Sequence, residues 1–595
     1  MKSYSLLCSW LYYSKWVAAI CTLISTWLFY SLSRKSENVA RYDVGVPSLP
    51  ADKVIAENSF KKEECSTEIP CYAPATGAFL GLIRPQTNED IDLAILESQK
   101  AQNSWAQTTF KQRKQVLQSI ETYVLEHQEE ISRIACLDSG KTMIDATLGE
   151  ILVTVEKLRW THLHGEKALR PSKRPTNLLM AYKNNYVIYE PLGVVAALIS
   201  WNYPFHNLIG PIISAIFAGN GIIVKASEHT AWSAAYFTQI VKGALQVCGH
   251  CPNLVQTVVT WPHTANYLTS HPGISHVTFI GSRPVAKLVA ASAAKSLTPI
   301  IAELGGKDAA IILDSAKTDL PRIIEIILRG TFQAAGQNCI GIERCIACPN
   351  VYNELTSALE VRIKAIRVGS TLDASKNYQV DMGAMISDVS FERLEKLIEA
   401  AVNDGARLLV GGHRFRHPLH TNGKYFEPTL IVDVTPNMAI SNEECFGPIC
   451  VVMRARDVEE ACNYANQPSF GLGASVFGAE GVEVDTVVRK IKSGMVAVND
   501  FAAYYAVQLP FGGVAKSGYG RFAGKEGLRG LCNLKAVCRD RWGWLGIRTS
   551  IPNSIRYPVY DTDKGYKFIK AVVMMGYGVN LGEKFSALWE LWKNC

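Results

Sequence analysis

Short apolar runs alternate with helical patterns through the middle of this chain. The runs are rich in valine and isoleucine, and they cover residues 193–199, 222–225, 254–259, 276–280 and 308–313. Segments with helical spacing of apolar residues separate them at 208–220, 230–245 and 284–295. Buried strands that alternate with helices are typical of parallel sheets covered by helices. The pattern therefore predicts an α/β fold, which further strands over 426–434 and 450–455 extend toward the C-terminus.

The length and the composition limit the class of protein. The chain has 595 residues, of which 48% are hydrophobic and 19% are charged, so we expect a globular protein of two to four domains. The net charge of +7 is small and no long basic block occurs, which argues against a nucleic-acid partner. Sixteen scattered cysteines and the lack of any Asn-x-Ser/Thr sequon favour a reducing compartment and a body that faces the cytosol.

The N-terminal segment Trp16–Ser33 has no charged residue over 18 positions and lies between Lys15 and Arg34. A run of this length can span a bilayer, with some tilt or thinning. A cleaved signal peptide would have a shorter apolar core followed by a small-residue cleavage site, and none is evident. We therefore predict a single-pass membrane protein. The endoplasmic reticulum is the favoured membrane, because the Arg-rich, amphipathic presequence of mitochondrial import is missing.

Two residues suggest covalent chemistry. Cys339 follows Gly336-Gln337-Asn338, and Glu303 precedes Leu304-Gly305-Gly306-Lys307. A cysteine and a carboxylate in such settings fit a nucleophile and the general base that later activates water. Cys339 taken alone fits a buried structural cysteine better, because free cysteines are among the most buried residues. The rest of the chain decides between these readings.

Polar residues follow three of the predicted strands. Asn202 follows the first strand, and its side-chain amide could donate to an oxyanion. Lys225 and Glu228 follow the second strand and could bind ribose hydroxyls. Gly281-Ser282 joins a later strand to a helix whose N-terminus suits a pyrophosphate. Parallel α/β sheets bind ligands at the carboxyl ends of their strands, so this distribution predicts a nucleotide site.

These residues, with Glu443–Pro448 and Pro510–Gly513, occur in the order of the NAD(P)-dependent aldehyde dehydrogenase superfamily, which the chain resembles over about residues 65–540. The stretch 517–532 and the N-terminal apolar run are similar to a fungal membrane-anchored branch, the meiotic sister-chromatid recombination protein type. The resemblance implies an aldehyde dehydrogenase-like α/β fold. Its parts would be a Rossmann-like NAD domain, a catalytic α/β domain and a β-ribbon for oligomerisation, preceded here by a transmembrane helix.

The resemblance also implies roles for individual residues. Cys339 would attack the aldehyde to give a thiohemiacetal and then a thioester, which Glu303 would hydrolyse by activating water. The side chain of Asn202 and the backbone N–H of Cys339 would form the oxyanion hole. The implied cofactor-binding residues are Trp201, Lys225, Glu228, Gly281, Ser282, Glu444 and Phe446. NAD is expected rather than NADP, because the carboxylate of Glu228 would repel a 2′-phosphate.

The expected partners and domain limits follow from the same resemblance. We expect an aldehyde substrate, lipid-derived if the site is tethered to a membrane, a homodimer or homotetramer, and no bound metal. The predicted parts are a membrane anchor (1–40), a stalk (41–64), an NAD-binding domain (65–305, with a returning segment near 483–500), a catalytic domain (306–482), an oligomerisation segment (501–540) and an extension (541–595).

Two alternatives to an oxidising dehydrogenase remain. An acylating enzyme would pass the thioester to coenzyme A, but such relatives usually lack the base at the position of Glu303. A non-catalytic scaffold would keep the fold without turnover. The cofactor turn departs from the family pattern in a way that leaves the scaffold open, because Ala286 replaces a usual glycine and Arg283-Pro284 is unusual.

Two other features are set apart from this site. The pairs Cys248/Cys251 and Cys345/Cys348 resemble redox or zinc motifs, but the first follows a predicted helix and the second lies in a strand-like run. The C-terminal extension carries four tryptophans among basic residues, with an apolar run at 568–579 too short to span a membrane. It could lie at a membrane interface or pack on the body as a surface strap.

Overall fold

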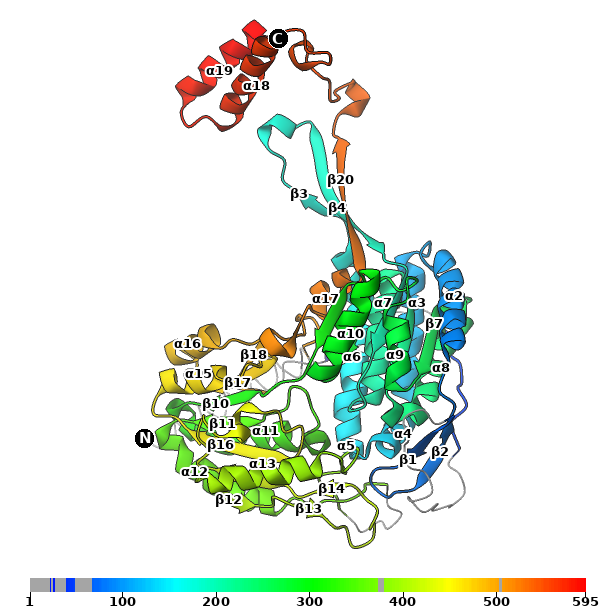
Figure 1. Ribbon diagram of the computed structural model, residues 1–595, viewed down its shortest axis with the longest axis vertical. Helices are drawn as coiled ribbons and strands as arrows, with labels where there is room; N and C mark the ends of the chain where they lie inside the picture. Colours follow the sequence, from blue (N-terminus) through cyan, green and yellow to red (C-terminus); the bar gives the residue numbers. More distant parts are fainter. Residues whose placement is uncertain are drawn as a thin grey trace.

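The computed structural model describes residues 22, 25–26, 39–48, 67–372, 379–501 and 506–594. Two lobes form the body, each built around a mainly parallel sheet (Figure 1). A narrow ribbon of strands projects from the body, and a pair of helices lies at its far end. The predicted α/β architecture is confirmed.

The first lobe contains a six-stranded sheet in the order β19-β9-β8-β5-β6-β7. Strands β5 to β9 run parallel to one another, and β19 is antiparallel to β9 at the edge. The strands are β5 (Val194–Leu198), β6 (Gly221–Ala226), β7 (Val255–Val259), β8 (Val277–Ile280), β9 (Ile300–Glu303) and β19 (Gly518–Tyr519). The predicted strands β5 to β8 are thus confirmed to within one or two residues.

Helices surround this sheet. They are α2 (Asn88–Trp105), α3 (Phe110–Glu126), α4 (Gln128–Ser139), α5 (Met143–Ala146), α6 (Val153–Leu169), α7 (Pro204–Ala218), α8 (Ala231–Val247), α9 (Pro262–Thr269) and α10 (Arg283–Ala293). Of these, α7, α8 and α10 correspond to the predicted helices over 208–220, 230–245 and 284–295. Helix α7 is apolar on almost every side and is buried between the sheet and α6, as its composition dictates. It therefore fixes the loop that precedes it, which carries Trp201 and Asn202.

The second lobe contains a seven-stranded sheet in the order β12-β15-β16-β11-β10-β17-β18. Its strands are β10 (Ala309–Ile312), β11 (Arg344–Ala347), β12 (Arg407–Val410), β15 (Thr429–Val432), β16 (Ile449–Arg454), β17 (Gly473–Phe477) and β18 (Met495–Val498). The helices that complete the lobe are α11 (Leu320–Phe332), α12 (Pro349–Lys364), α13 (Phe391–Asn403), α14 (Ala439–Asn442), α15 (Val458–Asn466) and α16 (Val482–Lys490). Two small hairpins lie outside the two main sheets. One pairs β1 (Ile69–Tyr72) with β2 (Phe79–Ile83), and the other pairs β13 (Arg414–Phe415) with β14 (Tyr425–Phe426).

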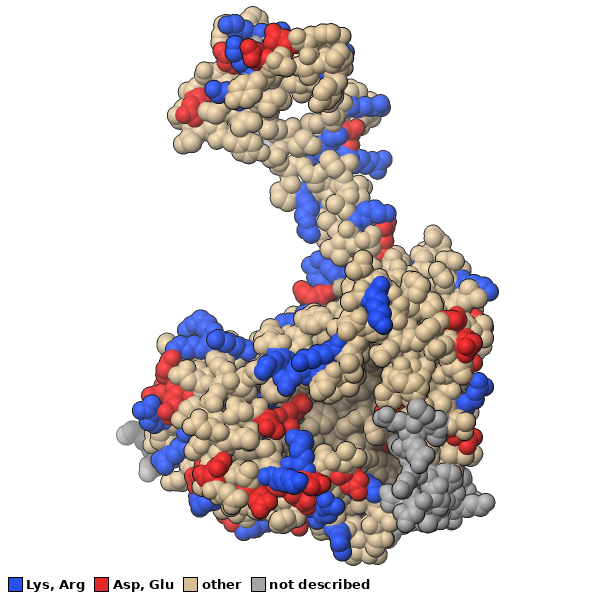
Figure 2. Space-filling view, viewed as in Figure 1, with Lys and Arg blue, Asp and Glu red and all other residues tan. Residues whose placement is uncertain are grey.

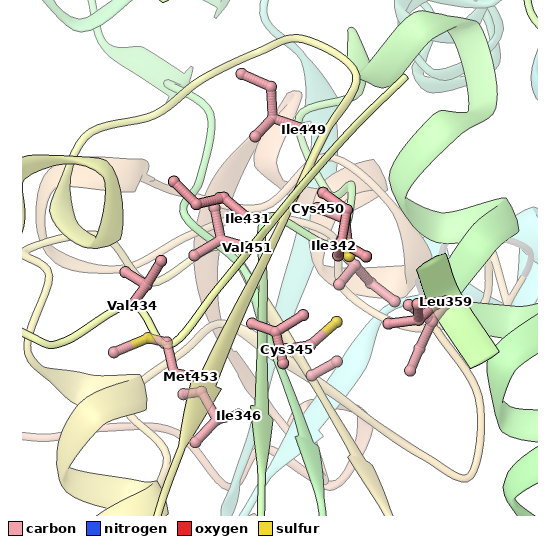
Figure 3. Close-up of a cluster of buried hydrophobic side chains, with 14 of the residues drawn as sticks. Ile342, Cys345, Ile346, Leu359, Ile431, Val434, Ile449, Cys450, Val451 and Met453 are labelled. Carbon is pink, nitrogen blue, oxygen red and sulfur yellow. The ribbon is translucent and has the colours of Figure 1, made fainter. Parts of the chain in front are cut away.

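The core of the second lobe lies along strands β11, β15 and β16 (Figure 3). Ile346, Ile431 and Val451 are fully buried, and burying a side chain of this size contributes about 1.5–3 kcal/mol. Cys345 lies among them as a free, fully buried thiol. Its place in a central parallel strand explains the strand-like pattern of the sequence around it.

The ribbon joins two distant segments of the chain. Strand β20 (Cys532–Asp540) pairs antiparallel with β4 (Lys183–Pro191), from Cys532 opposite Pro191 to Asp540 opposite Lys183, and β3 (Ser172–Arg174) pairs with the other side of β4. Helix α17 (Gly524–Gly530) precedes the ribbon, and helices α18 (Thr562–Tyr577) and α19 (Leu581–Asn594) follow it. Between the body and the ribbon the surface is deeply indented (Figure 2). Strand β20 borders this ribbon, and such edges pair readily with another chain.

The predicted membrane span is contradicted. In the described parts of the chain, no helix combines the length and apolar character that a bilayer crossing requires. The segment Trp16–Ser33, on which the prediction rested, lies outside the described residues apart from Thr22, Ser25 and Thr26. An uncharged run meets one condition for a span, but only a continuous helix satisfies the backbone groups in lipid. The single-pass topology, and with it the endoplasmic reticulum location, is therefore withdrawn.

Candidate active site

A cavity of about 470 Å³ contains most of the predicted site residues. Its lining includes residues from both lobes. Among them are eight of the ten residues singled out in the sequence: Trp201, Asn202, Gly281, Ser282, Glu303, Cys339, Glu444 and Phe446. Lys225 and Glu228 are not in the lining. They lie at the carboxyl end of β6, the strand beside β5.

Cys339 and Glu303 meet inside this cavity. Both side chains line the cavity, and the thiol of Cys339 interacts with the carboxyl group of Glu303, the last residue of β9. Burial raises the pKa of Glu303 to about 7. Burial, and then the neighbouring carboxylate of Glu303, raise the pKa of the Cys339 thiol well above its usual range. The pair therefore rests as a thiol beside a carboxyl group that can take its proton near neutral pH.

The loop before Cys339 has an unusual backbone. Ala334, Ala335 and Gly336 all have φ between 53° and 72°, in the left-handed region. A side chain at Gly336 would place its Cβ 2.1 Å from the carbonyl oxygen of Gly447, so only glycine fits there. This close approach brings the Cys339 loop against the loop that carries Glu444 and Phe446. Strain of this kind is concentrated at functional sites.

The side-chain amide of Asn202 is oriented by its neighbours. Its oxygen accepts hydrogen bonds from Ser200 Oγ at 2.7 Å and from Asn207 Nδ2 at 3.2 Å. The nitrogen therefore faces the Cys339 loop, where it donates to the carbonyl oxygen of Gln337 at 3.0 Å. The described residues provide no partner for its second N–H. An amide held in this way is a preorganised donor for negative charge that develops near Cys339.

A buried ion pair that the sequence did not reveal holds the backbone of Asn202 in place. Lys141 Nζ lies 2.6 Å from Glu150 Oε1 and donates to the backbone oxygen of Asn202 at 2.7 Å. The other carboxylate oxygen of Glu150 accepts from the backbone N–H groups of Phe205 and His206 at the start of α7. Both charged side chains are at most 2% exposed. In the sequence, Lys141 resembles only the end of a phosphate-binding loop, so its partner could not be inferred.

The side chain of Glu444 packs against the backbone of Gly305 and Gly306. Its Oε1 accepts from the backbone N–H of Gly306 at 3.0 Å, and a Cβ at Gly305 would lie only 2.2 Å from that oxygen. Burial, with the nearby carboxylate of Glu343 as a second cause, raises the pKa of Glu444 to about 8. Gly305 is thus required for the approach of Glu444 to the strand that ends at Glu303.

A second buried ion pair, also missed in the sequence, holds the Glu444 loop. Glu343 accepts from the backbone N–H groups of Cys445 and Phe446 at 2.8 Å each, and from Lys307 Nζ at 2.7 Å. Phe446 has φ of 52° and packs edge-on against Trp201, with ring centroids 5.6 Å apart. Charged residues that adjoin buried strands, as Lys307 and Glu343 do, are the sequence signal for such a pair.

The surface beyond Trp201, called the groove below, suits a dinucleotide. It carries Lys225, Glu228, Gly281 and Ser282. Lys225 Nζ and Glu228 Oε2 form an ion pair of 3.1 Å. Burial raises the pKa of Glu228, but Lys225, a backbone hydrogen bond and His229 together lower it below its usual value. Helix α10 begins just after Gly281-Ser282, where a Cβ on Gly281 would lie 2.9 Å from the ring of Phe279. A free helix N-terminus behind a glycine suits a pyrophosphate.

The departures from the family's cofactor turn leave this groove intact. Ala286 is buried in the hydrophobic cluster under the sheet, so its methyl group packs into the core. The guanidinium group of Arg283 lies 5.5 Å from the ring centroid of Phe470. Neither side chain therefore prevents a pyrophosphate from reaching the first turn of α10.

Comparison with known proteins agrees with this geometry. The sequence matches the aldehyde dehydrogenase family over residues 60–537. It is 50% identical over 529 residues to an aldehyde dehydrogenase-like protein of Schizosaccharomyces pombe, covering 89% of this chain and 100% of that protein. It is 30% identical over 478 residues to the NADP+ succinate-semialdehyde dehydrogenase of Mycobacterium avium, covering 80% and 96% of the two chains. A Mycobacterium tuberculosis aldehyde dehydrogenase solved with NAD+ has a TM-score of 0.73 and 27% identity, covering 84% of this chain and 98% of that one.

Proposed function

The chain belongs to the aldehyde dehydrogenase family, and we propose that it oxidises an aldehyde to a carboxylic acid through a thioester on Cys339, with NAD as the oxidant. The family prediction is confirmed, and the fungal relative agrees with the branch that the sequence resembles. The observation that carries the mechanism is that Cys339 and Glu303 line the same cavity and interact with each other there. A nucleophile and a base in contact are what covalent catalysis requires.

The first half of the reaction uses the thiol. Its proton passes to the carboxylate of Glu303 as the sulfur bonds to the aldehyde carbon, giving a thiohemiacetal. The side-chain N–H of Asn202 that the protein leaves unpaired and the backbone N–H of Cys339 stabilise the oxyanion. The former aldehyde carbon then loses a hydride, for which NAD, when bound, would supply the acceptor, and a thioester on Cys339 remains.

The second half needs Glu303 again. It must first lose the proton that it took from Cys339, which a pKa of about 7 allows near neutral pH. It then takes a proton from water as the water attacks the thioester, and the acid leaves with Cys339 regenerated as a thiol. A base in this position favours hydrolysis over transfer to coenzyme A, the acylating alternative.

NAD is the cofactor that the groove favours. The carboxylate of Glu228, with its pKa lowered by Lys225, would accept hydrogen bonds from ribose hydroxyls and repel a 2′-phosphate. Trp201, Gly281, Ser282, Glu444 and Phe446 would line the rest of the binding path. NADP remains the second choice, since a related enzyme uses it.

Three further expectations remain proposals or lose their support. The ribbon of β20, β4 and β3 suits the predicted homodimer or homotetramer. The domain limits drawn from the sequence stay a prediction. The preference for lipid-derived aldehydes rested on the membrane anchor and is withdrawn with it.

The deciding experiment replaces the nucleophile. Cys339→Ala should abolish aldehyde-dependent NADH formation while NAD binding persists, because the thiol is needed for the chemistry and not for the groove. Cys251→Ala is the matched control, since Cys251 is an exposed cysteine outside the cavity. Turnover by a folded Cys339→Ala protein would refute the mechanism. A wild-type protein that binds NAD but oxidises no aldehyde in a broad panel would favour the scaffold.

A further inference from the structure

Lys157 is a buried cation in the wall of the active-site cavity. It lies on α6, on the face that also buries Val153 and Thr161 at a spacing of four residues. Its residue surface is 9% exposed, and it lines the same cavity as Cys339. A lysine at an otherwise apolar helix position, directed into a cavity, needs a physical reason.

The described residues provide few hydrogen-bond or ion-pair partners for the buried ammonium group of Lys157. Its Nζ donates only one hydrogen bond, to the backbone oxygen of Phe522 at 3.4 Å, and no carboxylate in the described part of the chain forms an ion pair with it. The other buried lysines near the site differ. Lys141 and Lys307 have carboxylates at 2.6 and 2.7 Å. Burial lowers the pKa of Lys157 to about 8, so it still carries its charge at neutral pH.

The surroundings leave room for one negative charge. Gly210 lies beside this corner without a side chain, at a place where a Cβ would be 3.7 Å from Lys157 Nζ and 3.8 Å from the ring of His206. Burial, and then the charge of Lys157, lower the pKa of His206 to about 3, so the imidazole is neutral. Its Nδ1 is paired with Thr154 Oγ1 at 2.9 Å. With one cation and a neutral histidine, the corner suits a monoanion better than a doubly charged phosphate.

The rest of the wall is largely apolar. Val153, Ile280, Phe511 and Phe522 line the cavity together with Lys157 and the catalytic pair. A ligand that spans such a cavity would be apolar along its length and charged at one end. Its other end would lie at Cys339.

We propose that Lys157 binds a carboxylate at the end of the substrate remote from the aldehyde, so that the enzyme prefers oxo acids to uncharged aldehydes. The proposal rests on the proposed function, because it assumes that the aldehyde group reaches Cys339. The substrate carboxylate would form the ion pair that no carboxylate of the described residues forms with Lys157. An uncharged aldehyde would leave the buried ammonium group without an ion-pair partner. A site that must leave a buried charge unpaired rejects such a ligand strongly.

The kinetic test compares two aldehydes with the same number of carbon atoms, 5-oxopentanoate and pentanal. We expect the wild-type enzyme to favour 5-oxopentanoate by about 10- to 100-fold in kcat/KM, a factor typical of one charged hydrogen bond. In Lys157→Met this ratio should fall by a similar factor. Lys167→Met on the same helix is the control, because Lys167 is exposed, and its ratio should stay within about 3-fold of the wild-type value.

Lys157→Arg keeps the charge and should retain most of the preference, which a purely structural role for the lysine would not explain. It also covers the case in which Lys157→Met fails to fold, as melting curves of the variants would reveal. A wild-type preference for pentanal, or an unchanged ratio in a folded Lys157→Met protein, would overturn the proposal.

A binding measurement separates this proposal from the proposed function. Pentanoate and pentan-1-ol, which has the same number of carbon atoms and no charge, can be titrated into the wild-type protein and Lys157→Met by calorimetry without any turnover. Tighter binding of pentanoate that is lost in Lys157→Met supports the carboxylate site even if no aldehyde is oxidised. Binding of pentanoate that is no tighter than that of pentan-1-ol, or that is unchanged in Lys157→Met, refutes the site, whether or not aldehydes are oxidised.

Discussion

The thiol of Cys339 and the carboxyl group of Glu303 interact within one cavity, and each group shifts the pKa of the other. Burial alone would keep both groups uncharged. Their contact means that the proton lost by the thiol has a nearby acceptor within the same cavity. The reactivity of the nucleophile therefore depends on the charge of Glu303, which makes pH the first variable to test.

The rate should follow the ionisation of Glu303. Because its pKa is raised to about 7, the carboxyl group is mostly protonated below pH 7 and cannot act as a base. We expect kcat to fall about tenfold per pH unit well below pH 7 and to level off above pH 8. Glu303→Gln should lose this inflection, slow thioester hydrolysis by about 10²–10⁴-fold and accumulate an acyl adduct on Cys339.

Rapid-quench mass spectrometry of Glu303→Gln with aldehyde and NAD measures that adduct directly. The wild-type protein at pH 8 is the control, in which the adduct should turn over rapidly. A flat wild-type profile between pH 6 and 8, or no adduct in the variant, would contradict the role given to Glu303.

The buried pair of Lys141 and Glu150 should matter for both stability and rate. Glu150→Gln leaves the buried ammonium group of Lys141 without its counter-ion, a change that typically costs about 3–5 kcal/mol. It should also lower kcat, because Lys141 and the start of α7 fix the loop of Asn202. Urea unfolding and steady-state kinetics measure the two effects.

Glu360→Gln, in an i,i+4 pair on the surface of α12, should change stability by less than about 1 kcal/mol. Equal effects of the two substitutions would show that the buried pair has no special role.

The sequence predicted those parts of the molecule that depend on local patterns. Strands β5 to β8 could be placed because β-branched residues recur in short apolar runs, and residues at strand ends could be assigned because parallel strands present ligands there. The roles of Lys141 and Glu343 could not be found, because their partners lie on other elements and only the folded chain brings them together.

The N-terminal prediction failed for a different reason. Length and lack of charge over Trp16–Ser33 were taken as sufficient for a span, whereas the described residues contain no helix of the required length and apolarity. The pairing of β4 with β20, more than 300 residues apart in sequence, is likewise a long-range contact that local patterns cannot specify.

Cofactor choice should depend on Glu228. The wild-type protein is expected to bind NAD more tightly than NADP, since a carboxylate near the ribose repels a 2′-phosphate. Glu228→Gln removes the charge while Lys225 keeps its own, so the NAD-to-NADP preference should fall by about tenfold or more. Fluorescence titration with both cofactors measures the ratio, with Trp201 in the cavity as the reporter. A tighter complex of the wild-type protein with NADP would show that another cation outweighs Glu228.

Glu343 should control cofactor binding through the loop that it holds. Glu343→Gln exchanges one carboxylate oxygen for an NH2 group, which cannot accept from Lys307 or from the backbone N–H groups of Cys445 and Phe446. We expect the KM for NAD to rise by more than kcat falls, because Glu444 and Phe446 would no longer be held in place. Stability should also drop by about 3–5 kcal/mol, since the ammonium group of Lys307 stays buried.

A double variant distinguishes these two consequences of losing Glu343. In Lys307→Met/Glu343→Leu no buried charge is left unpaired, so much of the stability should return. The backbone hydrogen bonds to Cys445 and Phe446 remain absent, so NAD binding should stay weak. Urea unfolding and NAD titration of the wild type and both variants decide the matter. Recovery of NAD affinity together with stability would mean that Glu343 acts only on folding and does not position the Glu444 loop.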